Sequence, residues 1–117
     1  MDASERAAQL WVLLRLAAKN QQILTYDNVS KLIGVPRPGL GQLLEPIQSY
    51  CLVNNLPPLT ILVVSKETGL PGAGFIAARD IPKKQMEVFH FDWNTAETPS
   101  PEALRMAVSK RPSNGIA

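Results

Sequence analysis

Side chains that could carry out covalent or metal chemistry are few in this chain of 117 residues. It has one cysteine, Cys51, and one histidine, His90. Cys51 lies among apolar residues at helical spacing with no base beside it in the sequence, which is typical of a packing residue rather than a nucleophile. One cysteine and one histidine cannot form a metal site of recognised spacing, and paired catalytic carboxylates are not evident. The residues therefore predict no enzyme, no metal site and no cofactor.

A glycine-rich loop follows the most apolar stretch of the chain. The run over 59–64 is apolar or β-branched throughout, which predicts a strand covered on both faces. The loop after it has three glycines between 69 and 74, but it lacks the Lys-Ser/Thr ending of a phosphate-binding loop. The segment 75–78 predicts a second short strand, antiparallel to the first, so that 66–73 would form a wing between them.

Two helices are predicted in the first third of the chain. Ser4 can cap a helix that runs to about Lys19, with apolar residues recurring at helical spacing. The predicted buried stripe of this helix consists of Leu10, Leu13, Leu14 and Ala17. Thr25 is an N-cap candidate for a short helix over 26–33, which Gly34 is placed to end.

Further helices are predicted in the middle of the chain and towards its end. A third helix covers 40–54, where Pro46 removes a backbone donor and predicts either a kink or two helices. Asp80 is placed to cap a helix that ends near Phe91, and Ser100 followed by a proline begins another. The remaining residues, 111–117, have the composition of a frayed tail.

The order helix, short helix, turn, helix, strand and wing is that of a winged helix-turn-helix. Four segments sharpen this pattern: Ile23-Leu-Thr-Tyr-Asp-Asn-Val-Ser-Lys-Leu-Ile-Gly34, Gly41-Gln-Leu-Leu44, Leu56-Pro57 before Val63-Val64, and Gly69-Leu-Pro-Gly-Ala-Gly-Phe75. In their order and spacing they resemble the DNA-binding domain of the alkylguanine-DNA alkyltransferases and the alkyltransferase-like proteins. The resemblance covers about residues 5 to 76, roughly two thirds of the chain, and implies DNA binding.

The residues that carry out the reaction of that family are missing. The reaction needs Pro-Cys-His-Arg directly before the Val-Val pair, so that a thiolate activated by the histidine attacks the alkyl carbon. Here the places of the cysteine, histidine and arginine are taken by Thr60, Ile61 and Leu62. The family's arginine that fills the place of the flipped base has no clear counterpart either. We therefore expect binding without a repair reaction.

Five residues are candidates for contact with duplex DNA: Tyr26, Lys31, Arg37, Gln42 and Lys66. Tyr26 matches the family's tyrosine that contacts the DNA backbone. The cationic side chains could reach phosphates, and the glutamine could read a base edge. The alternative is that they are solvated surface residues, because Glu45 and Glu67 lie nearby in the sequence and weaken the positive field.

Three aromatic residues alternate at period two near the end of the chain: Phe89, Phe91 and Trp93. This spacing conflicts with a helix that runs through all three. Either they cover the core, or they are exposed and mark a surface that binds a protein partner. The second hypothesis for the function is therefore a protein-interaction module, of an accessory or immunity type, built on the same scaffold.

Composition and net charge indicate the general class of the protein. Hydrophobic residues make up 45%, charged residues 19% and the net charge is +2, a globular profile that is less basic than that of most dedicated nucleic-acid-binding proteins. The apolar runs are shorter than the roughly 20 residues of a membrane span. We expect a cytoplasmic α+β protein of a single domain, 1–117. Residues 5–78 would form its winged part with a two-stranded ribbon, and 80–110 an added helical extension.

Overall fold

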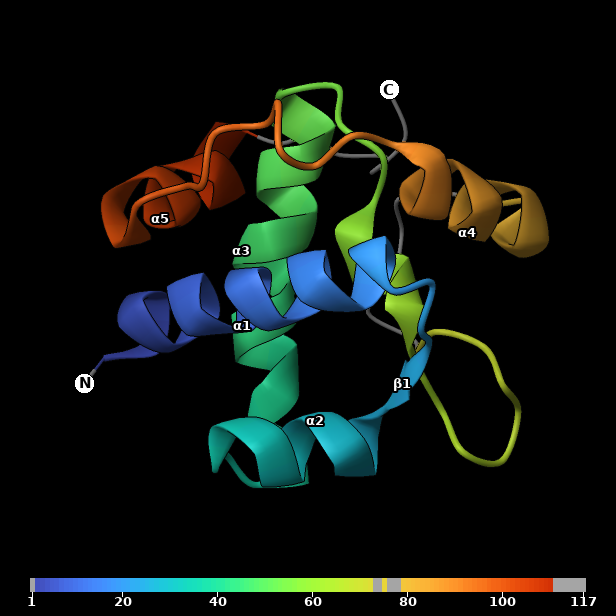
Figure 1. Ribbon diagram of the computed structural model, residues 1–117. Coiled ribbons are helices and arrows are strands. Elements are labelled where there is room, and N and C mark those ends of the chain that lie inside the picture. The colour runs from blue at the N-terminus through green and yellow to red at the C-terminus, as the bar shows by residue number, and fades with distance from the viewer. Residues whose placement is uncertain (1, 73–74, 76–78, 111–117) are drawn as a thin grey trace.

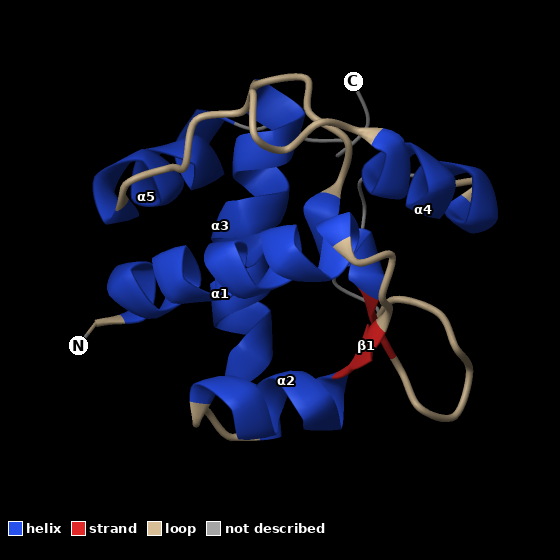
Figure 2. Ribbon diagram, in the orientation of Figure 1, coloured by secondary structure: helices blue, strands red, loops and turns tan. Residues whose placement is uncertain are grey.

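The computed structural model describes residues 2–72, 75 and 79–110. Helix α3 (Leu40–Val53) runs through the middle of the molecule, and α1 (Ala3–Lys19) crosses in front of it in Figure 1. Helices α4 (Ile81–His90) and α5 (Pro101–Lys110) flank one end of α3, while α2 (Tyr26–Ile33) lies at the other end. Figure 2 shows that helix predominates over a single small sheet in this part of the chain, which is an α+β arrangement.

The first two helices begin at residues whose side chains satisfy free backbone N–H groups. Asp2, rather than the predicted Ser4, caps α1, and its carboxylate accepts a hydrogen bond from the Glu5 N–H at 2.9 Å. Thr25 caps α2 as predicted and accepts from the Asn28 N–H at 3.1 Å. Gly34 ends α2 in the left-handed conformation, with φ of 71°, which a residue without a Cβ adopts at little cost.

Helix α3 is continuous through Pro46, so the alternative of two separate helices is wrong. The proline leaves the Gln42 carbonyl without its helical donor, but Gln42 is exposed and water can take the place of that donor. Buried Leu43 and Ile47, on either side of the proline, hold the helix against the core. Tertiary packing thus outweighs the local effect of the proline.

The small sheet differs from the prediction in its partner and direction. Among the described residues, strand β2 (Val63–Val64) pairs in parallel with β1 (Leu24–Thr25), a partner that the sequence did not predict. Phe75 is not in a strand, and 76–78 lie outside the described residues. The strand predicted over 59–64 is extended only at Val63–Val64, because its first part, Leu59–Leu62, is a 3-10 helix. All six residues of the run over 59–64 are buried, as predicted, because an apolar run indicates burial but does not distinguish extended from helical backbone.

The C-terminal helices attach through local caps and one tryptophan. The Asp80 and Ser100 side chains accept hydrogen bonds at the starts of α4 and α5, as their positions predicted. The segment between the two helices holds Trp93, whose indole N–H donates to the Val88 carbonyl at 2.8 Å. Its ring meets that of Trp11 edge-on, with centroids 5.9 Å apart. Trp93 is therefore part of the core that α1 and α3 share.

Candidate nucleic-acid interface and aromatic groove

The five predicted DNA-binding residues lie at one corner of the molecule. We call this the α2–α3 corner and define it as α2, the turn 34–39, the first turn of α3 and the loop 65–72. Arg37, in the turn, lies 3.5 Å from Asp27 of α2, and both side chains are about half exposed (52% and 48%). Lys31 is exposed four residues after Asp27, so it lies on the same face of the helix. The acid thus has a cation on each side.

The loop 65–72 brings Lys66 to the same corner. The pKa of the Glu67 carboxyl is lowered, chiefly by the hydrogen bond that the Ser65 hydroxyl donates to it at 2.8 Å, and further by the charges of Arg37 and Lys66. Two cations that both act on one carboxylate lie on the same side of the molecule. The turn and the loop therefore present one surface.

Tyr26 fastens the loop to the start of α2. Its hydroxyl oxygen accepts a hydrogen bond from the Gly72 N–H at 2.7 Å, and its ring is half-buried against the core. A Cβ at position 72 would collide with this hydroxyl, so glycine is needed there for the close approach. Only the hydroxyl proton of Tyr26 is left to donate to a phosphate. The main role of Tyr26 is therefore to position the loop rather than to contact phosphate.

Helix α3 offers only its beginning to a ligand. Gln42 is exposed in the first turn, whereas Ile47 and the two residues after it are buried between neighbouring helices. Exposed residues at the N-terminal end of a helix are the ones that reach base edges when a helix enters the major groove. The corner therefore has one side chain suited to base reading and three suited to phosphates.

Acidic side chains accompany the cations at the corner. Asp27 contacts Arg37, and Glu67 lies in the field of Arg37 and Lys66. A further cation, Arg6 of α1, donates to the Ile33 carbonyl at the end of α2 at 2.9 Å. Charges of opposite sign in close proximity reduce the positive field that attracts phosphate, so the geometry brings the predicted residues together at a corner of mixed charge.

The place of the alkyltransferase cysteine is part of the core. Thr60, Ile61 and Leu62 are buried in the 3-10 helix, and the Thr60 hydroxyl has no hydrogen-bond partner among the described residues. The one cysteine, Cys51, is fully buried, and burial raises the pKa of its thiol to about 12. A thiol with such a pKa stays protonated at neutral pH and is inert as a nucleophile.

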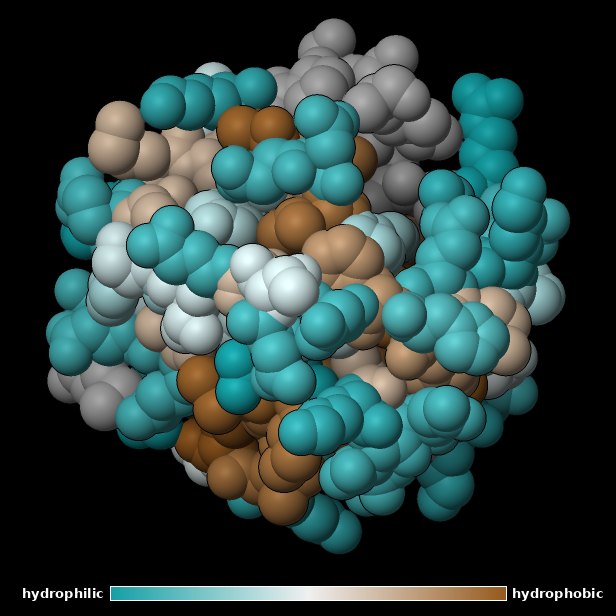
Figure 3. Space-filling model, turned by 45° about the horizontal axis from the view of Figure 1, so that its top comes forward, coloured by the Kyte–Doolittle hydropathy of each residue, from teal (hydrophilic) through white to brown (hydrophobic). Residues whose placement is uncertain are grey.

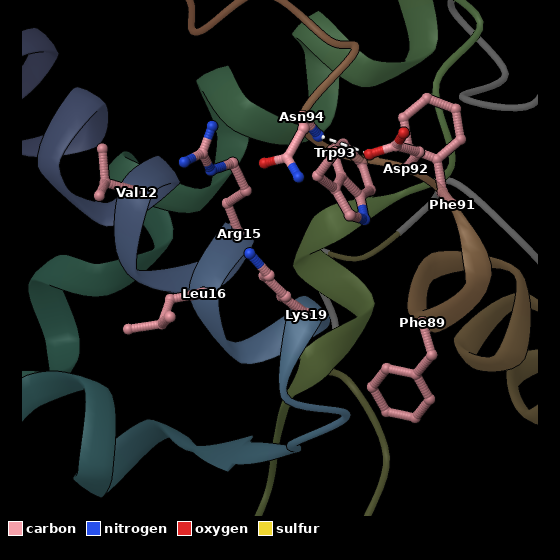
Figure 4. Close-up of a pocket in the computed structure, with 9 residues that line it drawn as sticks. All are labelled: Val12, Arg15, Leu16, Lys19, Phe89, Phe91, Asp92, Trp93 and Asn94. Atoms are coloured by element: carbon pink, nitrogen blue, oxygen red, sulfur yellow. Dashed lines mark hydrogen bonds between the residues drawn. The ribbon is translucent and has the colours of Figure 1, made fainter.

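The aromatic residues divide between core and surface. Trp93 is only 4% exposed, whereas Phe89 and Phe91 are half-buried and line a groove of about 350 Å³ between α1 and the end of α4. Figure 4 shows the α1 side chains on one side of this aromatic groove and the aromatic rings on the other. The groove is lined by Val12, Arg15, Leu16, Lys19, Phe89, Phe91, Asp92, Trp93 and Asn94.

Sequence reasoning missed the contribution of α1 to this groove. The predicted buried stripe is largely confirmed, since Leu10, Leu14 and Ala17 are buried and Leu13 is half-buried. The lining residues 12, 15, 16 and 19 form a second stripe at helical spacing on another face. A helix with apolar residues on two faces was the available signal.

The described residues include neither a helix suited to span a membrane nor a metal-binding cluster. No helix in this part of the chain combines the length and apolarity that a membrane span requires. Within the same ranges, His, Cys, Asp and Glu side chains form no group of three or more that could hold a metal ion.

Comparison with protein-family models, curated proteins and solved structures found no match in any of the three.

Proposed function

We propose that this chain is a non-enzymatic DNA-binding protein, alkyltransferase-like in its first two thirds, which uses the α2–α3 corner as a winged helix-turn-helix. The observation that carries the proposal is that the turn and the loop both attach to the start of α2: Arg37 lies 3.5 Å from Asp27, and the Gly72 N–H donates to the neighbouring Tyr26 hydroxyl at 2.7 Å. Cations from the turn and from the loop are thereby available to the same stretch of phosphate backbone.

Each part of the corner has a role in the proposed complex. Lys31, Arg37 and Lys66 contact phosphates, and the loop held by Tyr26 acts as the wing. Gln42, at the exposed start of α3, is directed at a base edge in the major groove. One base-reading side chain supports little sequence discrimination, so binding is expected to be largely independent of sequence.

The acids at the corner set the expected strength of binding. Sequence-independent complexes have dissociation constants of about 10⁻⁴ to 10⁻⁶ M at physiological salt, and Asp27 and Glu67 beside the cations place this chain at the weak end. Arg37 must also exchange its contact with Asp27 for one with phosphate. The complex is expected to form readily only at low ionic strength.

The proposed role is binding rather than catalysis, because the only thiol is buried and protonated. Its pKa of about 12 leaves almost no thiolate at neutral pH. The position that corresponds to the alkyltransferase cysteine carries Thr60, which is buried in the core.

The test is a fluorescence-anisotropy titration of a labelled DNA duplex at low salt. The double variant Arg37→Glu/Lys66→Glu is expected to bind at least about tenfold more weakly than wild type, because two phosphate contacts become repulsions. The matched control is Lys83→Glu/Lys110→Glu, which makes the same change in net charge at exposed residues of α4 and α5, at the other end of α3.

Two outcomes would overturn the proposal. One is the absence of binding by wild type at about 10⁻⁴ M protein in low salt, which is the weak limit of sequence-independent complexes. The other is an equal loss in the control variant, which would mean that the duplex responds to total charge rather than to the corner.

A further inference from the structure

The aromatic groove exposes apolar surface on both of its sides. Val12 and Leu16, one turn apart on α1, are 53% and 55% exposed although both are large and hydrophobic. Phe89 and Phe91 line the other side as half-buried rings, and Figure 4 shows Arg15 and Lys19 between the two sides. In Figure 3, apolar residues reach this face of the molecule in more than one area, with hydrophilic residues between them. Apolar surface that is gathered beside a hollow marks a place of contact with another molecule.

Two cations on the α1 side of the groove are free of ion pairs. Arg15 and Lys19 make no salt bridge or hydrogen bond with a residue that the structure describes, whereas Arg37, Lys84 and Arg105 each have an acidic partner. The one acid that lines the groove, Asp92, accepts a hydrogen bond from the Asn94 N–H at 3.1 Å. The rim is therefore positive, with donors available for carboxylates.

Internal contacts hold two of the aromatic side chains that line the groove. Trp93 forms part of its lining, fixed by the hydrogen bond to Val88, and the Phe91 ring packs against it with centroids 4.7 Å apart. A preformed site of this kind loses little conformational entropy when a ligand binds. Aromatic and arginine side chains in such positions are the residues that dominate binding energy at protein interfaces.

We infer that the aromatic groove binds a short acidic amphipathic helix of a partner protein. Apolar side chains of that helix, spaced three or four residues apart, pack on Val12 and Leu16 and on the aromatic rings, and its carboxylates reach Arg15 and Lys19, which lie between the two. The lining residues 12, 15, 16 and 19 recur at i, i+3, i+4 and i+7, so α1 offers a ridge of the length and spacing that suits a second helix.

Single-stranded nucleic acid fits the same groove less well. Bases bind such proteins by stacking on exposed aromatic faces. Trp93 is 4% exposed, and the most exposed apolar side chains of the groove are the aliphatic Val12 and Leu16. The inference does not rest on DNA binding at the α2–α3 corner, because the two surfaces share no residue.

The first experiment is a selection from a displayed random-peptide library on the wild-type protein, with counter-selection against the variant Leu16→Glu. The variant places a carboxylate in the groove at an exposed position, where folding is not expected to suffer. The selected sequences are expected to combine leucine, phenylalanine or tryptophan at helical spacing with aspartate and glutamate.

The best selected peptide is then titrated against a set of variants by fluorescence anisotropy. Leu16→Glu and the double variant Arg15→Glu/Lys19→Glu are each expected to bind at least about tenfold more weakly than wild type, the loss typical of a hot-spot residue. The control Leu32→Glu places the same charge at a leucine of α2 that is 61% exposed and does not line the groove, and it is expected to bind as wild type.

Several results would overturn the inference. A selection that enriches nothing over the Leu16→Glu variant, or that enriches basic peptides, contradicts an acidic partner. Tight binding of a labelled single-stranded oligonucleotide that is lost in Leu16→Glu assigns the groove to nucleic acid. Self-association in sedimentation experiments that is abolished by the same variant assigns it to a second copy of the chain.

Discussion

The α2–α3 corner and the aromatic groove differ in the side chains that lie beside their cations. At the corner the charges meet one another: Arg37 contacts Asp27, and Glu67 accepts from Ser65 in the field of Lys66. At the groove Arg15 and Lys19 have no ionic partner among the described residues and lie beside exposed apolar side chains. The corner thus combines cations with acids, and the groove combines cations with apolar surface.

This difference separates the kinds of ligand that the two surfaces suit. A ligand at the corner must compete with the internal contact of Arg37, which favours weak and salt-sensitive binding. A ligand at the groove covers apolar surface and finds cations that are already free, which favours a compact and specific contact. Only Arg37 among the cations of the two surfaces has an acidic partner, since Lys31 and Lys66, like Arg15 and Lys19, form no salt bridge with a described residue. The exposed apolar side chains beside its cations are what distinguish the groove.

The largest expected effect is a selective loss of groove binding. Leu16→Glu should weaken the binding of the selected acidic peptide by more than about tenfold, because a carboxylate enters an apolar contact and repels the ligand's charge. The same variant should bind duplex DNA as wild type does. Anisotropy titrations with both ligands test this, and a parallel loss of both would show that the surfaces are not independent.

A smaller effect is expected where Tyr26 fastens the loop to α2. Tyr26→Phe removes the acceptor of the Gly72 N–H and should lower the free energy of unfolding by about 1 kcal/mol, measured by urea denaturation. Binding of duplex DNA should weaken because the wing is no longer held, while peptide binding at the groove should stay unchanged. Unchanged stability would contradict the structural role given to this hydroxyl.

Removing negative charge from the corner should strengthen DNA binding modestly. Asp27→Asn/Glu67→Gln frees Arg37 and Lys66 from their acidic neighbours, and we expect duplex affinity to rise by about threefold at low salt. The matched control Glu87→Gln/Glu102→Gln removes the same charge from α4 and α5, where each acid pairs with a neighbouring cation. An equal gain in the control would mean that the corner has no special part in binding.

The smallest effect is expected in the core between the two surfaces. Thr60→Val replaces a buried hydroxyl that has no partner among the described residues by a methyl group of similar size, and should change the unfolding free energy by less than about 1 kcal/mol, in the stabilising direction. The affinities for duplex DNA and for the selected peptide should both stay unchanged. A large destabilisation in thermal or urea unfolding would reveal a partner for the hydroxyl.

The corner was largely predictable because its signals are local. Thr25 and Gly34 fix the bounds of α2 through a cap and a left-handed residue, and both lie within one turn of the helix end. The opposite holds for the run over 59–64, where the residues indicated burial but not conformation. A long strand needs a neighbour of matching length, and β1 offers only Leu24–Thr25.

The groove was not predictable because it arises from tertiary contact. The alternation of Phe89, Phe91 and Trp93 left core and interface open, and the fold divides them when α1 brings Trp11 against Trp93. The exposure of Val12 and Leu16 likewise depends on which face of α1 the other helices cover. Local sequence contains neither the pairing of Arg37 with Asp27 nor the absence of a partner for Arg15.

The salt dependence of duplex binding tests the central proposal most directly. Three phosphate-contacting cations predict that the logarithm of the association constant falls with the logarithm of salt concentration at a slope of about −2 to −3, and that Arg37→Glu/Lys66→Glu reduces the slope by about 2. A slope that is the same in wild type and in this variant, or the absence of any binding at low salt, would contradict the assignment of DNA binding to the α2–α3 corner.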